Sequence, residues 1–107
     1  MYRPLPDSLT IKVSGINGLG LFSKKDILKG TNLGISHSKI NSMLIRTPLG
    51  GFINHSDTPN CIKIKSIISN IDDPDIKFDY TKYNLITLEH IKENTELTLK
   101  YTFYNIK

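Results

Sequence analysis

Short runs of branched and aromatic residues, each bounded by Gly, Pro, Asn or Asp, follow one another along most of the chain. Runs of this kind are typical of short β-strands separated by turns. We therefore expect a mainly β fold with strands over residues 9–13, 20–23, 31–35, 62–68, 76–80, 85–88 and 97–101.

Within one of these runs, Ile62 and Ile64 alternate with Lys63 and Lys65. A period of two predicts a strand with one buried and one wet face. No stretch shows a long apolar period of 3.6 residues, and the best helical candidate, residues 38–46, is short. Turn signals lie between the runs, as Asn17-Gly18, Lys29-Gly30, Gly50-Gly51 and the segments 57–60 and 72–75.

Composition narrows the class of protein without changing this picture. The chain has 107 residues, 38% of them hydrophobic and 22% charged, which predicts one soluble globular domain over residues 1–107. The net charge of +4 comes from lysines scattered along the chain, so nucleic acid is not expected as the main partner.

The number of cysteines and the length of the apolar runs indicate in which cellular compartment the protein is expected. Cys61 is the only cysteine, so no intramolecular disulfide and no multi-cysteine zinc cluster can form, and we expect no metal site. Residues 1–6 lack an apolar signal core, and no apolar run approaches the ~20 residues of a membrane span. These features predict a soluble intracellular protein that is neither secreted nor membrane-bound.

Three segments hold the candidate chemistry, and each also has an ordinary structural reading. Residues 15–22 place glycines just before a strand, either as a turn or as backbone that a ligand can approach. Residues 51–61 gather Asn, His, Ser and Asp in one loop, which could be a turn bonded to its own backbone. A Ser-His-Asp hydrolase is disfavoured there, because adjacent residues in one turn do not normally face each other. Residues 96–101 end a strand in Tyr101, which alone would be a packing residue.

Taken together and in order, these segments resemble the SET-domain family of protein lysine methyltransferases. The matching stretches are GLGLFS (18–23), FINHS (52–56), PNC (59–61) and ELT (96–98) with Tyr101. The resemblance implies a β-clip-like fold of several small sheets with little helix and a C-terminal pseudo-knot.

The resemblance also implies a cofactor, S-adenosyl-L-methionine. Backbone groups of Gly18, Leu19 and Gly20 would line its methionyl part. Asn54 would hydrogen-bond its amino acid end, and His55 would use its backbone on adenine.

The family's catalytic tyrosine matches Tyr101, which would stand where a substrate lysine meets the methyl group of the cofactor. Leu99, Phe103 and Tyr104 would line the substrate channel. The implied activity is transfer of a methyl group to a lysine of a protein substrate, with histones as the familiar targets. The small size suggests a viral or microbial protein, in the cytoplasm or in a host nucleus.

The sequence departs from the family pattern in several places. Gly51 stands where a basic residue often precedes Phe-Ile-Asn-His, and Leu99 stands where an aromatic residue often sets the number of methyl groups added. The segment 34–50 is shorter than the usual insert that builds one wall of the substrate groove, so a homodimer that completes this wall is a hypothesis. Two alternatives remain open, a SET-like binding module with weak or no turnover and a non-enzymatic β-clip-type domain.

Overall fold

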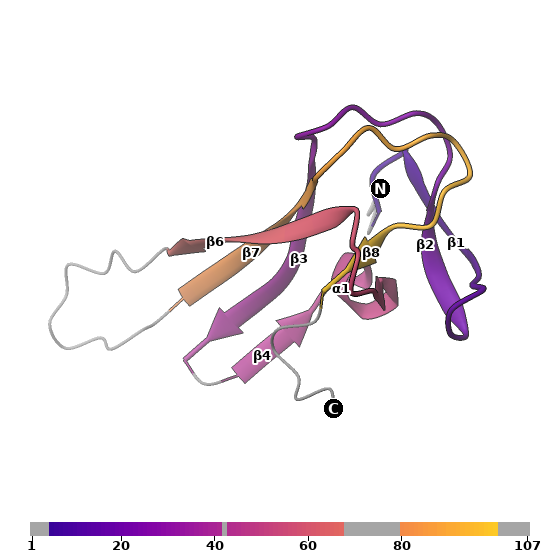
Figure 1. Ribbon diagram of the computed structural model, residues 1–107. Coiled ribbons are helices and arrows are strands. Elements are labelled where there is room, and N and C mark those ends of the chain that lie inside the picture. Colours follow the sequence, from indigo (N-terminus) through magenta and orange to yellow (C-terminus); the bar gives the residue numbers. More distant parts are fainter. Residues whose placement is uncertain (1–4, 42, 68–79, 101–107) are drawn as a thin grey trace, which may run out of the picture.

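The computed structural model describes residues 5–41, 43–67 and 80–100, which fold mostly as β-strands (Figure 1). The elements in chain order are β1 (Leu9–Val13), β2 (Leu19–Ser23), β3 (Asn32–Ile40), β4 (Met43–Arg46), α1 (Pro48–Phe52), β5 (Asn54–His55), β6 (Cys61–Ile67), β7 (Tyr80–Thr87) and β8 (Thr98–Leu99). The predicted mainly β class is confirmed. In this part of the chain, no helix has the length and apolar character needed to cross a bilayer.

The larger sheet has the strand order β4-β3-β7-β6-β8-β5. Its strands pair in antiparallel fashion from β4 to β6, whereas β8 pairs in parallel with β6 and with β5. The strand nearest the C-terminus is thus inserted between two strands from the middle of the chain, as a C-terminal pseudo-knot implies. Residues 101–107, whose course would complete the pseudo-knot, lie outside the described residues.

The smaller sheet consists of β1 and β2, whose bounds agree with the predicted strands to within one residue. They pair in antiparallel register from Leu9 opposite Ser23 to Val13 opposite Leu19. Isolated bridges between Phe22 and Glu96 and between Ile27 and Ile91 tie this part of the chain to the segment that precedes β8 (Figure 1). The glycine-containing turn before β2 is thereby held close to the C-terminal strand.

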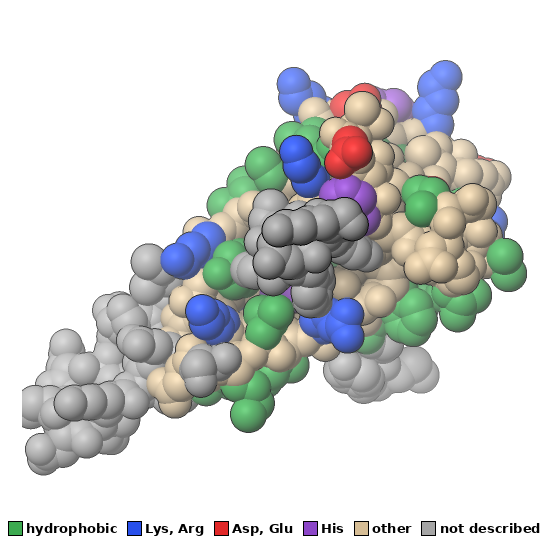
Figure 2. All heavy atoms as spheres, turned by 60° about the horizontal axis from the view of Figure 1, so that its bottom comes forward, with side chains coloured by type: hydrophobic (Ala, Val, Ile, Leu, Met, Phe, Trp, Pro, Cys, Tyr) green, Lys and Arg blue, Asp and Glu red, His purple; other side chains and the backbone are tan. Residues whose placement is uncertain are grey.

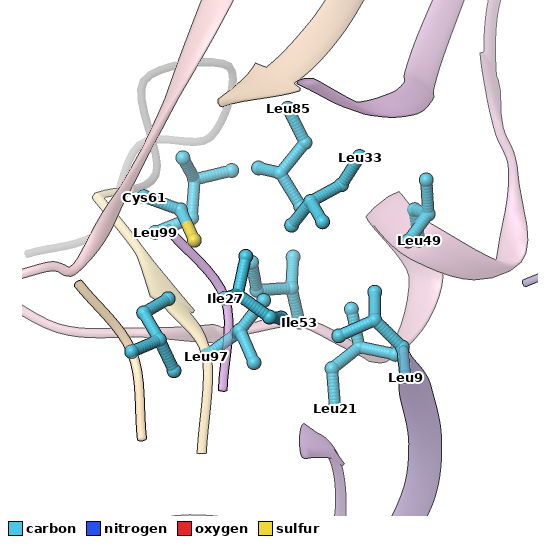
Figure 3. Close-up of a cluster of buried hydrophobic side chains, with 11 residues drawn as sticks. Leu9, Leu21, Ile27, Leu33, Leu49, Ile53, Cys61, Leu85, Leu97 and Leu99 are labelled. Atoms are coloured by element: carbon cyan, nitrogen blue, oxygen red, sulfur yellow. The ribbon is translucent and has the colours of Figure 1, made fainter. Parts of the chain in front are cut away.

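A single cluster of buried aliphatic side chains and one thiol connects the two sheets (Figure 3). Its members come from β-strands of both sheets, from α1 and from the segments between them: Leu9, Leu21, Ile27, Leu33, Leu49, Ile53, Cys61, Leu85, Ile91, Leu97 and Leu99. Leu21, Leu85 and Leu97 are fully buried at 0% exposure, so truncating any of them would cost about 2–5 kcal/mol.

The prediction of a short helix over residues 38–46 is wrong, because this segment is the hairpin of β3 and β4. Ser38 lies opposite Lys82 of β7 on one side and Ile45 of β4 on the other. Asn41 has a φ of 54° and so reverses the chain in the left-handed region that asparagine tolerates. Pairing on both sides of β3 overrides a weak helical pattern, and the predicted strand over 31–35 therefore extends to Ile40.

The alternation in β6 is present, but its apolar face is not the buried one. Ile62 and Ile64 are 42% and 49% exposed, whereas the Lys63 ammonium lies 5.9 Å from the centre of the Tyr83 ring and Lys63 is half-buried. The inner face of the sheet is taken by Tyr83 and Leu85 of β7, and the lysine stem packs there as amphipathic side chains can. Hydrophobic side chains accordingly lie between lysine and arginine side chains on the molecular surface (Figure 2).

Other predicted features fall partly outside the described residues. Of the predicted strand 76–80, only Tyr80 is described, and it begins β7, which runs through the predicted strand 85–88 to Thr87. The turn predicted at 72–75 is not described. Gly18 and Gly30, with φ of 48° and 80°, form turns as predicted.

Candidate functional site

The one-turn helix α1 brings the Asn54 segment to its place. Thr47, just before the helix, donates from its hydroxyl to the carbonyl oxygens of Ile35 at 2.6 Å and Ser36 at 3.1 Å, which fastens the helix start to β3. Gly50 packs so closely on β3 that a Cβ there would meet the Ser36 carbonyl oxygen and the His37 ring. The chain then leaves α1 as β5, which begins at Asn54.

Two pairings place Asn54 beside the other candidate segments. Asn54 lies opposite Thr98 in the parallel pairing of β5 with β8, and Glu96 lies just before that strand. Glu96 is in turn bridged to Phe22 of β2. The fold therefore gathers the predicted glycine, asparagine and C-terminal segments at one place, as the resemblance implied.

The side-chain amide of Asn54 is the point where these segments meet. Its Nδ2 lies within hydrogen-bond distance of four acceptors: Ser14 Oγ at 3.0 Å, the Asn17 carbonyl oxygen at 3.1 Å, the Leu19 carbonyl oxygen at 3.2 Å and Glu96 Oε2 at 2.8 Å. A primary amide carries only two N–H hydrogens, so acceptors outnumber donors here. Asn54 is 8% exposed, and no described residue donates a hydrogen bond to its Oδ1.

Ser14 is a residue of this cluster that sequence reasoning missed. Its Oγ lies 2.8 Å from each carboxylate oxygen of Glu96 and accepts from the backbone N–H groups of Ile16 at 2.8 Å and Asn17 at 3.2 Å. Ser in a turn of the form Ser-Gly-Ile-Asn-Gly is an expected backbone acceptor. Nothing in the local sequence indicates a partner 82 residues away.

Gly20 is needed for a reason other than the expected one. From the sequence, the glycines of residues 15–22 were expected to let a ligand approach the backbone. A Cβ on Gly20 would instead collide with the Glu96 carboxylate and lie 3.1 Å from Asn54 Nδ2. Gly20 thus allows the close approach of two protein side chains, while Gly18 and Leu19 are exposed residues.

The loop after Asn54 is largely satisfied by its own groups. His55 Nε2 lies 3.2 Å from Asp57 Oδ1 on the surface, and the Thr58 N–H donates to Ser56 Oγ at 3.1 Å. Within this loop the His55 ring contacts Asp57 and the Ser56 hydroxyl contacts Thr58, so the two do not form a pair of base and nucleophile, as expected for neighbours in one turn. From this loop, the side chains of Asn54 and Asn60 donate hydrogen bonds to Glu96, in the segment before β8.

The part of the site assigned to the substrate channel is described only in part. Leu99 is buried and lines a hollow of about 380 Å³ together with Pro59, Cys61, Ile62, Lys63, Leu88 and Lys100. Tyr101, Phe103 and Tyr104 lie outside the described residues, so their assigned roles remain predictions.

No described lysine or arginine forms an ion pair with Glu96, so the chain around Asn54 presents one carboxylate and several carbonyl oxygens. These acceptors face Asn54 Nδ2, and the amide oxygen Oδ1 is the acceptor that suits a cationic, hydrogen-bond-donating group.

Comparison with known proteins finds similarity over most of the chain. A family model described as SET domain matches residues 36–102. The solved structure of a candidate histone methyltransferase from Plasmodium falciparum is similar, with a TM-score of 0.69 and 20% sequence identity over 90% of this chain and 98% of that one. At this identity the likeness concerns the fold. No curated protein matches the sequence.

Proposed function

The chain belongs to the SET-domain family, and we propose that it transfers a methyl group from S-adenosyl-L-methionine to a lysine side chain of a protein substrate. The observation that carries the proposal is the meeting of three separated segments at the Asn54 amide. A structural turn alone would not require the amide to contact a carboxylate 42 residues away.

The side-chain amide of Asn54 fits the amino acid end of the cofactor. That end carries an ammonium group, and the amide oxygen Oδ1 of Asn54 is a group that accepts from ammonium. We assign Gly18, Leu19, Gly20 and Asn54 to the cofactor, with the backbone of His55 on its adenine.

When bound, the cofactor supplies a methyl group already activated on a sulfonium. The substrate lysine has to present a neutral amine, whose ordinary pKa of about 10.4 falls in an apolar channel because burial disfavours the cation. The protein's contribution is then chiefly to orient the amine. We assign this role to the hydroxyl of Tyr101, with Leu99, Phe103 and Tyr104 as walls of the channel.

Calorimetric titration of S-adenosyl-L-methionine tests the cofactor assignment. We expect saturable binding to the wild type and a loss of at least about tenfold in Asn54→Ala, which removes the amide. Asn84→Ala is the matched control, because Asn84 lies on β7, which β6 and β8 separate from β5. Absence of binding to the wild type, or equal binding by both variants, would contradict the proposal.

A methyl-transfer assay on lysine-containing peptides tests the reaction. A histone tail is the first substrate to try, because the structural neighbour is described as a candidate histone methyltransferase. Tyr101→Phe should lower turnover while cofactor binding persists. Equal turnover in this variant would remove Tyr101 from the catalytic assignment.

A SET-like binding module without turnover is the second candidate, favoured by Gly51 at the position where the family often has a basic residue. Cofactor binding with no transfer to any lysine substrate would support it. A homodimer that completes the substrate groove also stays a prediction. Light scattering that finds only monomers at working concentration would contradict the dimer.

A further inference from the structure

Glu96 and Ser14 form a directed hydrogen-bond chain that ends on Asn54. The Ser14 hydroxyl can donate to Glu96 while its oxygen accepts from Ile16 and from Asn54 Nδ2. Glu96 Oε2 accepts from the same Nδ2 at 2.8 Å. With Glu96 ionised, every donor in this hydrogen-bond network points to an acceptor.

This hydrogen-bond network permits only one orientation of the Asn54 amide. Turning the amide over would place Oδ1, which can only accept, against the Glu96 carboxylate and the carbonyl oxygens of Asn17 and Leu19. Those three contacts of Nδ2 would be replaced by repulsion between acceptors, and the Ser14 hydroxyl could donate to Oδ1 only by giving up Glu96. The amide nitrogen Nδ2 therefore faces Glu96 and the carbonyl oxygens of Asn17 and Leu19, and the amide oxygen Oδ1 points away from them.

The backbone of Glu96 is itself fixed on both sides. Its carbonyl oxygen accepts from Asn60 Nδ2 at 2.9 Å, and the N–H of the next residue, Leu97, donates to the Leu21 carbonyl oxygen at 2.8 Å. Gly20 leaves just enough space for the carboxylate. A side chain held in this way can transmit its own position to Asn54.

We infer that Glu96 is a positioning residue: it fixes the amide of Asn54 so that Oδ1 is presented to the ammonium group of the cofactor. The inference rests on the proposed function for the identity of the ligand. The orientation of the amide is independent of it. Glu96 acts through Asn54 and makes no bond to the reacting atoms.

Four variants test the inference by calorimetry with S-adenosyl-L-methionine: Glu96→Ala, Glu96→Gln, Asn54→Ala and the double variant. Glu96→Ala should weaken binding by about tenfold to a hundredfold, because the amide is then free to turn. Glu96→Gln should stay within about threefold of the wild type, since its Oε1 can accept from both Asn54 Nδ2 and the Ser14 hydroxyl. Adding Glu96→Ala to Asn54→Ala should cost nothing further.

The opposite results overturn the inference. Unchanged affinity in Glu96→Ala removes any positioning role, and additive losses in the double variant mean that Glu96 acts independently of Asn54. A Glu96→Gln variant as weak as Glu96→Ala would show that the charge, not the orientation, matters. Methylthioadenosine, which lacks the amino acid end, serves as the ligand control, and its affinity should be the same in wild type and Glu96→Ala.

A ligand-free measurement separates this inference from the proposed function. The two side-chain amide protons of Asn54, assigned by their loss in Asn54→Ala, should shift in the NMR spectrum of Glu96→Ala and remain near their wild-type positions in Glu96→Gln. If the wild type binds no cofactor, the proposed function fails, yet this spectrum still decides whether Glu96 orients Asn54. Unmoved Asn54 signals in a folded Glu96→Ala would overturn the inference.

Discussion

Asn60 and Thr98 hold each other by a reciprocal pair of hydrogen bonds: the Thr98 N–H donates to Asn60 Oδ1 at 2.8 Å, and the Asn60 N–H donates to Thr98 Oγ1 at 3.2 Å. Through its Nδ2, Asn60 also donates to the Glu96 carbonyl oxygen. One side chain at the start of β6 thus fixes the short strand β8 and the carboxylate-bearing residue before it.

Replacing Asn60 by Ala should therefore lower the free energy of unfolding by about 2–3 kcal/mol, because two backbone groups near β8 lose their partners. Urea unfolding measures the change. Thr58→Ala is the control, since Thr58 is exposed in the same loop. Equal stability of the two variants would mean that Asn60 does not hold β8.

A methyl group on Gly20 should disrupt the site from within. Its Cβ would meet the Glu96 carboxylate, so we expect Gly20→Ala to cost about 1–3 kcal/mol in stability and to weaken binding of S-adenosyl-L-methionine. Gly15→Ala is a matched control, because no atom lies within 4 Å of a Cβ there and its φ is not positive. Thermal unfolding measures the stability of both variants, and calorimetry measures their cofactor binding. A Gly20→Ala variant with unchanged stability and binding would contradict the observed packing.

Gly51 should accept a basic side chain without strain. Nothing lies within 4 Å of a Cβ at this position in α1. Gly51→Arg should raise stability by up to about 1 kcal/mol through helix propensity, and on the proposed function it should tighten cofactor binding about threefold to tenfold by contacting the carboxylate of the cofactor. Gly51→Ala shares the gain in propensity but lacks the charge. Tighter binding in both variants alike would argue against a carboxylate contact.

Stability should fall in mildly acidic solution because of His37. Burial, and then the charges of Lys63 and Arg46, lower the pKa of His37 from 6.5 to about 4. As the pH falls, the unfolded chain therefore takes up a proton at this residue at a higher pH than the folded chain does. The contribution of neutral His37 to the free energy of unfolding is fully present above pH 6.5 and is lost as the pH falls toward 4. At about 1.4 kcal/mol per pKa unit, the loss approaches roughly 3 kcal/mol.

Urea titrations across this pH range measure the effect, with His37→Gln as the comparison. The variant cannot take up the proton, so its stability should change less steeply than that of the wild type. Parallel curves for the two proteins would show that His37 does not govern the acid sensitivity.

Cys61 should be inert in the folded protein. Burial, with a smaller contribution from the charge of Glu89, raises the pKa of its thiol to about 12, and the side chain is 1% exposed. Labelling by a thiol reagent at neutral pH should be at least about a hundredfold slower in the native state than in concentrated urea. Thr58→Cys in a Cys61→Ser background supplies an exposed thiol for comparison. Rapid labelling of native Cys61 would contradict its burial.

Local patterns in the sequence predicted the elements that depend on local properties. The strand at 9–13 and the turns at Gly18 and Gly30 follow from β-branched runs and glycine conformation, and they are confirmed. The motif around Asn54 likewise indicated which segments would meet, because the family resemblance carries information about long-range contacts that propensity lacks.

Features set by partners distant in sequence were beyond local reasoning. Residues 38–46 became a hairpin because β7 pairs with β3. The isoleucine face of β6 turned outward because Tyr83 and Leu85 occupy the other side. Glu96 was recognised as part of a motif, but its contact with Ser14 across 82 residues depends on the full fold.

The insertion of β8 between β5 and β6 has a consequence for the order of events during synthesis. Both flanking strands, β5 and β6, are synthesised before residues 98–99, so neither can pair with β8 until translation has passed these residues. Asn54 meets Glu96 only when translation has passed this point, and Ser56 donates to Leu99 only then. Assembly of the site is thus among the last steps of folding, and a slow, late phase is expected from contacts of such long sequence separation.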